Sequence, residues 1–383
     1  MSKRRQKNNK SAAQSQPPQS TKRSTTTTVT SSASAKSVRK SSKSPYPSPA
    51  VLIGGVIVAL VSGLALVFWR AGSINTNSGG SSSANITATA IAAFATPVAY
   101  TEGDVRYCTG VMPPFAKALG FNANVLVDTR ARVVKGVQLI EVDQSGKTTR
   151  SYQHPSWTMA GYLGPQVTDR FGNIYLTPVP FINLLDNPVE KANIIYRIDA
   201  NTGEMSPLVD LPAVAAPSLD NVYGLLGLAY DCDTNSLYAS SVLGSTRDQQ
   251  LGRLFRIDLK TGQVASILEG VDAFGLNVFN SARGKRLYFG RARVAEINSV
   301  SLDANGDFSG ELRTEFSIAD LGVSGDERAR VLNFSGRDQL VIQIKQFAFN
   351  LVAPTESLQT ALEYRYDSAA DTWHLVNAYQ VDS

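Results

Sequence analysis

In the C-terminal part of the chain, apolar and polar residues alternate in a short pattern that returns five times. An aromatic or aliphatic residue is followed by a polar residue, a second apolar residue and then Asp. Period-two alternation is typical of a half-buried β-strand. Turn residues follow each copy and predict a tight hairpin. The copies, spaced by 56, 59, 45 and 64 residues, are 140–143, 196–199, 255–258, 300–303 and 364–367.

A second apolar segment precedes every copy, and a third precedes four of them, so each unit reads as four short antiparallel strands. Four-stranded units repeated around an axis form a β-propeller. We expect an all-β fold with five or six four-stranded blades over residues 96–383, and we prefer five because five units are legible. Residues 96–121 are too short for a further blade. We expect them to supply the innermost strand of the first blade, or an edge strand that closes the ring.

Several of these units resemble the blades of a known superfamily. The residues concerned are 227–231 with Leu237-Tyr238, 254–258 with Thr261-Gly262, and 284–288. They resemble blades of six-bladed propellers of the NHL-repeat, gluconolactonase and strictosidine-synthase-like groups, over residues of about 160–376. Because the motifs belong to blades and not to active sites, the resemblance implies a fold and says little about activity.

The resemblance also allows a test for the lactonase metal site, which consists of Glu, Asn and Asp in the central tunnel. The stretches comparable to the Glu and Asn turns are 163–165 and 273–275. Leu163 and Phe274 offer no oxygen there, and a hard cation needs several oxygen ligands. We therefore expect no catalytic residue, no metal and no cofactor. A hydrolase or lyase of the lactonase or strictosidine-synthase type is the alternative function.

Two other candidate chemistries are weaker. Residues 303–307 begin like a calcium loop, but Phe308 stands where Gly is required, so we predict an ordinary hairpin turn. The two histidines, His154 and His374, have no recognisable nucleophile beside them, and we interpret both as packing or surface residues.

The first 101 residues contain no Asp or Glu, and within them lies an uncharged apolar run at 50–69. About 20 apolar residues match the ~30 Å hydrocarbon core of a bilayer. Eleven Lys and Arg precede the run and only Arg70 follows it before Arg106, which predicts a cytoplasmic N-terminus. A cleaved signal peptide fits less well, because the basic region is long and no A-x-A site follows.

This pattern divides the chain into a disordered basic cytoplasmic tail (1–49), a single transmembrane helix (50–70), a flexible linker (71–95) and an extracytoplasmic propeller (96–383). The tail is a candidate for contact with anionic lipid or nucleic acid. Residues 71–383 hold 25 Lys and Arg against 32 Asp and Glu, a net charge of −7, which argues against nucleic acid as a partner of the propeller. A small-xxx-small ridge for helix packing is Gly55, Ala59 and Gly63, although small residues are common in such helices.

Cys108 and Cys232 are the only cysteines, both on the predicted outer side. A disulfide and two buried free thiols are both open interpretations, because sequence alone does not place the two residues in contact.

Long connections predict where a partner binds. In a propeller the loops after the second and fourth strands share one face, and those at 177–193, 243–252, 346–361 and 211–221 are long. Exposed apolar loop residues mark interfaces, although the same residues would also serve to cap the blades or the tunnel mouth. We expect a non-enzymatic membrane-anchored module that binds a protein or cell-envelope component. The candidate partner-binding residues are Phe181, Leu184, Leu185, Phe347 and Phe349.

Overall fold

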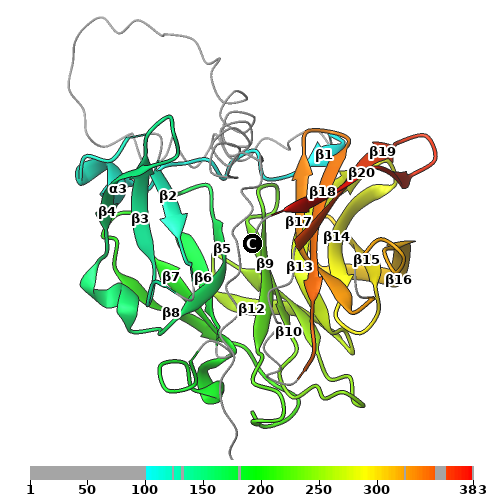
Figure 1. Ribbon diagram of the computed structural model, residues 1–383, viewed down its shortest axis with the longest axis horizontal. Helices are drawn as coiled ribbons and strands as arrows, with labels where there is room; N and C mark the ends of the chain where they lie inside the picture. Colours follow the sequence, from blue (N-terminus) through cyan, green and yellow to red (C-terminus); the bar gives the residue numbers. More distant parts are fainter. Residues whose placement is uncertain are drawn as a thin grey trace, which may run out of the picture. The chain divides into compact units, whose positions relative to one another are not determined.

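Five antiparallel sheets follow one another along the chain and form a β-propeller of five blades (Figure 1). The computed structural model describes residues 101–122, 125–130, 133–179, 183–322, 325–349 and 359–381. The strands are β2 (Val125–Asp128), β3 (Gln138–Val142) and β4 (Thr148–Tyr152) in blade one; β5 (Leu163–Thr168), β6 (Ile174–Pro178), β7 (Ile194–Ile198) and β8 (Met205–Asp210) in blade two; β9 (Leu225–Asp231), β10 (Ser236–Ser241), β11 (Arg253–Asp258) and β12 (Gln263–Glu269) in blade three; β13 (Ala273–Ser281), β14 (Gly284–Arg291), β15 (Glu296–Leu302) and β16 (Phe308–Ser317) in blade four; and β17 (Glu327–Ser335), β18 (Gln339–Gln346), β19 (Gln359–Asp367) and β20 (Thr372–Val381) in blade five.

The recurring sequence pattern lies on the third strand of the full blades, so the predicted repeat is confirmed. Its Asp closes the turn to the fourth strand. In blade three, Oδ1 of Asp258 accepts a hydrogen bond from the backbone N of Lys260 (2.8 Å), and Gly262 then takes a positive φ of 71°. In blade two, Oδ1 of Asp199 accepts one from the backbone N of Asn201 (2.9 Å). Short Asp-to-backbone bonds and a Gly of positive φ thus fix the turn in these two hairpins, whereas in blade five Asp371 takes the positive φ of 55°.

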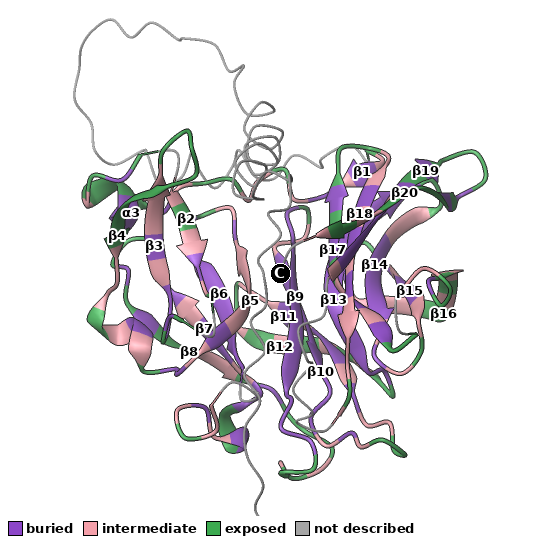
Figure 2. Cartoon of the chain, viewed as in Figure 1, coloured by how far each residue is buried: buried purple, intermediate pink, exposed green. Residues whose placement is uncertain are grey.

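Burial decreases from the inner strands of a blade to its outer strands (Figure 2). β9, β10 and β13 are buried along their whole length, whereas β12 alternates and β4 is largely exposed. The buried side chains form a cluster at each of four successive blade junctions. Among the described residues, none of these clusters joins blade five to blade one. Representative members are Leu139 and Leu163 (blades one and two), Tyr175 and Leu237 (two and three), Tyr238 and Leu287 (three and four), and Phe279 and Leu340 (four and five).

The segment before blade one differs from our expectation. Its described residues, 101–121, form neither an innermost strand of blade one nor an edge strand between the last blade and the first. Instead, β1 (Gly103–Asp104) pairs with β13 of blade four, and a short helix, α3 (Pro114–Ala118), packs on blades one and two. Pro113 and Pro114 carry no backbone N–H for a strand ladder, which favours the helix start.

Within the described residues, blade one therefore has three strands where four were predicted, and the six-blade count of the resembling superfamily is not confirmed. We call residues 103–119 the N-terminal strap. In Figure 1 the strap, in cyan, runs from β1 to α3 across the ends of the intervening blades.

The predicted membrane segment lies outside the described residues. The tail (1–49), the helix (50–70) with Gly55, Ala59 and Gly63, and the linker (71–95) all belong to that part of the chain. No helix within the described ranges is long and apolar enough to cross a bilayer. The membrane anchor therefore stays a prediction from sequence.

Candidate functional site

The long connections of blades two, three and five meet at one end of the blades, which we call the long-loop face. Their apolar side chains share one group of contacts, here named the face cluster. The β6–β7 loop includes the 3-10 helix η3 (Val189–Lys191), which contributes Val189 to this cluster. The buried members are Val189, Val222, Tyr223, Leu226, Val242, Phe274 and Ala292, and Leu184, Phe347 and Phe349 pack against them.

The structure separates the candidate partner-binding residues into two kinds. Phe347 packs on the cluster, with its ring centroid 4.4 Å from that of Phe274 and 5.1 Å from that of Phe349. Leu184 packs on the same cluster, whereas its neighbour Leu185 is 91% exposed. Phe181 lies outside the described residues. Leu184, Phe347 and Phe349 thus help to cap the cluster, while Leu185 faces solvent.

A polar pocket of about 820 Å³ lies beside Phe347 and Phe349 on the same face. Its arginines are held mainly by backbone. Arg293 donates to the backbone O of Thr246 (2.7 Å) and to Oδ2 of Asp272 (2.5 Å). Arg328 donates to backbone carbonyls, and burial lowers its pKa. Three acids share the lining with the cations, so the pocket carries both signs of charge: Asp220, Asp248, Asp326, Arg247, Arg293 and Arg328.

A second hollow, the axial cavity, lies where the innermost strands converge and has a volume of about 450 Å³. Its walls come from β5, β9, β13, β17 and β18, with Arg106 entering from the N-terminal strap. The charged residues of its lining are Arg106, Arg330 and Lys345, and the lining contains no Asp or Glu. The neutral polar side chains around it are Gln166, Asn277, Asn333, Gln343 and Gln359.

Arg330 is the least compensated of these cations. Its guanidinium carbon lies 4.3 Å from the ring centroid of Phe274 and 5.7 Å from that of Phe347. Burial lowers the pKa of Arg330. Within the described ranges, its side chain forms no ion pair. The two phenyl rings therefore provide cation–π contacts to its guanidinium.

The two positions that replace lactonase ligands are core residues here. Leu163 is fully buried at the junction of blades one and two, and Phe274 is fully buried beneath Phe347. In the part of the chain that the structure describes, no three His, Cys, Asp or Glu side chains lie close enough together to hold a metal ion.

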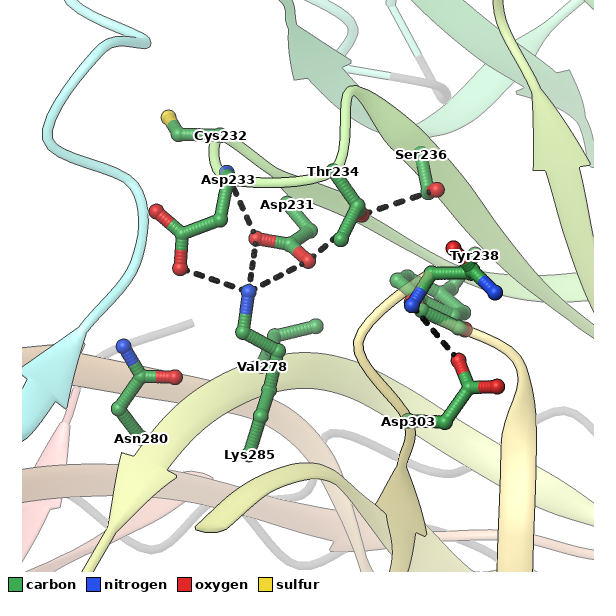
Figure 3. A network of polar contacts seen from close by, with 12 residues as sticks. Asp231, Cys232, Asp233, Thr234, Ser236, Tyr238, Val278, Asn280, Lys285 and Asp303 are labelled. Carbon is green, nitrogen blue, oxygen red and sulfur yellow. Dashed lines mark hydrogen bonds and ion pairs between the residues drawn. The ribbon is translucent and has the colours of Figure 1, made fainter. Parts of the chain in front are cut away.

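The N-terminal strap is fixed to the blades by a disulfide and a polar network. Cys108 and Cys232 form a disulfide that closes a sequence separation of 124 residues. Figure 3 shows Nζ of Lys285 reaching both carboxylates of the adjacent β9–β10 turn, Asp231 (2.8 Å) and Asp233 (2.6 Å). Tyr107 of the strap donates its hydroxyl to Oδ1 of Asp233 (2.7 Å).

Arg106 is placed by the same strap. Its Nη2 lies 2.9 Å from Oδ2 of Asp104 and donates to the backbone O of Phe334 (2.5 Å) on β17. The backbone N of Asp104 donates to the O of Gly336 (2.9 Å) in the next turn. The strap thus carries Arg106 to the wall of the axial cavity.

The remaining candidate residues have local roles. Residues 303–307 form the β15–β16 turn, as predicted, with Oδ1 of Asp303 accepting from the backbone N of Asp307 (2.9 Å). His154 caps the 3-10 helix η2 (Pro155–Thr158) by accepting from the backbone N of Ser156 (3.2 Å). His374 lies exposed on β20.

No family model matches the sequence, and no curated protein matches it significantly. Solved structures with a similar chain path include the periplasmic gluconolactonase of Pseudomonas aeruginosa, at 14% identity over 67% of this chain and 69% of that chain, with a TM-score of 0.43. A protein from Lactobacillus plantarum is 13% identical over 67% of this chain and 68% of that chain, with a TM-score of 0.39. The Dos1 propeller is 11% identical over 69% of this chain and 58% of that chain, with a TM-score of 0.36. Likeness at this level carries no inference about activity.

Sequence reasoning missed the axial cations. Arg328 and Arg330 precede the apolar strand predicted from Val331. Both belong to the innermost strand β17, and charged residues on an innermost strand were the signal that could have indicated a polar cavity. Arg106 gave none, because its position depends on the path of the strap.

Proposed function

We propose that this protein is a binding module that takes a protein or cell-envelope component at its long-loop face. One observation supports this most directly: long connections from blades two, three and five pack on a common apolar cluster. A loop that rests on a rigid base is pre-ordered, which lowers the entropic cost of binding. A pocket with both charge signs lies beside the apolar base, and such a polar rim is typical of protein interfaces.

Exposed apolar side chains on this face give the proposal its contact points. Leu185 is 91% exposed in the β6–β7 loop, and Leu219 is 73% and Val214 48% exposed in the β8–β9 connection. Burying a side chain of this size contributes about 1.5–3 kcal/mol. Two or three of them buried together would dominate the affinity of a standard interface.

The lactonase-type alternative finds less support. Its chemistry rests on carboxylate and amide oxygens around a divalent cation, whereas the residues that line the axial cavity bring Arg106, Arg330 and Lys345. A cavity with this charge repels a metal ion.

We further propose that the propeller is displayed on the outer side of a membrane, with its N-terminus in the cytoplasm. The support is the apolar run at 50–69 and the eleven basic residues that precede it. The bilayer is then one partner of the chain, and anionic lipid is a second partner for the basic tail.

The binding role is tested by cross-linking the full-length protein in its own membranes and measuring the recovery of co-purified components. Leu185→Ser should reduce recovery by about tenfold or more, because the buried apolar contact is lost. Val376→Ser is the matched control, since Val376 is 60% exposed but lies on β20. Equal recovery from both variants would refute the long-loop face as the site.

A further inference from the structure

We propose that the axial cavity is a separate binding site for a small organic anion, a hydroxylated carboxylate or phosphate ester. The inference begins from charge and concerns a different opening of the molecule from the long-loop face. The lining combines cations from three segments, the strap, β17 and β18, with no carboxylate among its residues. Asp104 compensates Arg106 through an ion pair of 2.9 Å, so Arg330 contributes most of the uncompensated positive charge of the lining. A concave, low-dielectric wall concentrates the field of such a charge and attracts anions.

Arg330 is the residue that we expect to bind the acidic group of the ligand. Arg330 is partly buried, and a cation removed from water is ordinarily paired, because an uncompensated charge costs folding free energy. Phe274 and Phe347 lie around the guanidinium, with its carbon 4.3 and 5.7 Å from the two ring centroids. A cation–π contact does not use the guanidinium N–H groups as hydrogen-bond donors to oxygen, so they remain able to bind a ligand. The in-plane N–H fork matches two oxygens of a carboxylate or phosphate.

The neutral lining favours a ligand with hydroxyl groups beside its charge. Oε1 of Gln166 is buried without a hydrogen-bond partner, although its Nε2 donates to the backbone O of Val127 (2.9 Å). A ligand hydroxyl would satisfy that acceptor, since a buried unpaired polar atom is costly. The side-chain amide of Asn277 already donates to the backbone O of Leu332 and accepts from the backbone N of Val278, so we assign it to the wall of the cavity and not to ligand binding.

The dimensions of the cavity agree with this ligand class. About 450 Å³ is within the range of small-molecule sites. The cavity also extends past β17 to Gln343 and Lys345 of β18 and to Gln359, so the site is not confined to the innermost strands. A ligand with one acidic group at Arg330 and a polar body along β18 would use the polar lining on that side.

Calorimetric titration of the full-length protein with glucuronate, glucose 6-phosphate and neutral glucose tests the proposal. At least one of the two anions should bind and glucose should not, and the tighter anion identifies carboxylate or phosphate as the recognised group. Arg330→Met should weaken binding by about tenfold to a hundredfold, the usual effect of losing hydrogen bonds to a charged group. Leu185→Ser should bind the anion as the wild type does, so this site can fail or stand independently of the long-loop face.

Arg365→Met is the control for net charge, because Arg365 is exposed, bonds Asp338 (2.7 Å) and is not part of the cavity lining. It should bind like the wild type. If Arg330→Met fails to fold by circular dichroism, Lys345→Met replaces it with the same expected weakening. The proposal is overturned if the wild type binds neither anion, if glucose binds as tightly, or if the cavity variant binds as well as the control.

Discussion

Two adjacent leucines show how finely burial divides the long-loop face. Leu184 packs on the face cluster and Leu185 is 91% exposed. The sequence alone gave no reason to separate them, because irregular loops have no hydrophobic period to follow. The contrast decides which substitutions report on binding and which report on stability.

Phe347→Ala should lower the free energy of unfolding by about 2–3 kcal/mol, because it removes ring contacts to Phe274, Tyr223 and Phe349. Leu185→Ser should change it by less than about 0.5 kcal/mol, as exposed positions generally do. Urea denaturation followed by tryptophan fluorescence measures both. If the two variants had the same stability, the face cluster would not be a packed base for the loops.

Asp233 predicts a pH dependence at a single residue. Burial acts to raise its pKa, but hydrogen bonds from Lys285 and Tyr107 outweigh it, and the pKa of Asp233 is lowered. A lowered pKa means that the carboxylate stabilises the fold fully above the ordinary Asp pKa of about 3.9 and loses this contribution as the pH falls below it.

Asp233→Asn should therefore destabilise the protein by about 2 kcal/mol at pH 7 and by much less near pH 2.5. Chemical denaturation at the two pH values measures the difference. Asp258→Asn, in an exposed hairpin turn of the same blade, is the control variant. A difference between wild type and Asp233→Asn that stays constant with pH would contradict the ionic role of Asp233.

Among the elements, the hairpins were the most predictable and the inner strands less so. An outer pair such as β11 and β12 has one solvated side, so its sequence alternates. β13 is buried on both sides, and its boundaries extend past the apolar residues that predicted it, from Ala273 to Ser281. Continuous burial removes the alternation that marks where a strand begins.

The N-terminal strap lay beyond prediction. Its two-residue strand β1 finds its partner in β13, far along the chain, and no local pattern encodes that pairing. Because the described part of the strap pairs with β13, it adds no innermost strand to blade one. Long-range pairing of a short segment depends on the completed blades and not on local propensity.

Removing the disulfide should weaken the strap as an element. In the double variant Cys108→Ser, Cys232→Ser, we expect the free energy of unfolding to fall by about 3–5 kcal/mol, because a crosslink over 124 residues restricts the unfolded chain. Calorimetric melting of both proteins, with and without reductant, measures the effect. The wild type in reductant should approach the variant, and an unchanged melting temperature would show that the polar network alone holds the strap.

At the scale of the whole molecule, the propeller is observed in the five sheets, whereas the membrane anchor is predicted from the sequence. Protease added to intact cells or protoplasts should remove the propeller and leave a small N-terminal fragment protected. The basic asymmetry across residues 50–69 predicts this orientation. Permeabilised cells are the control, in which the tail should also be cut. A protected propeller with a cut tail would reverse the orientation.

The central claim is that the long-loop face of this propeller holds a partner. A photo-cross-linking amino acid placed at Leu185 in the full-length protein tests it most directly, with Val376 on β20 as the comparison position. The account predicts a discrete cross-linked product from position 185 in native membranes and none from position 376. A product from position 376 alone, or the same products from both, would contradict it.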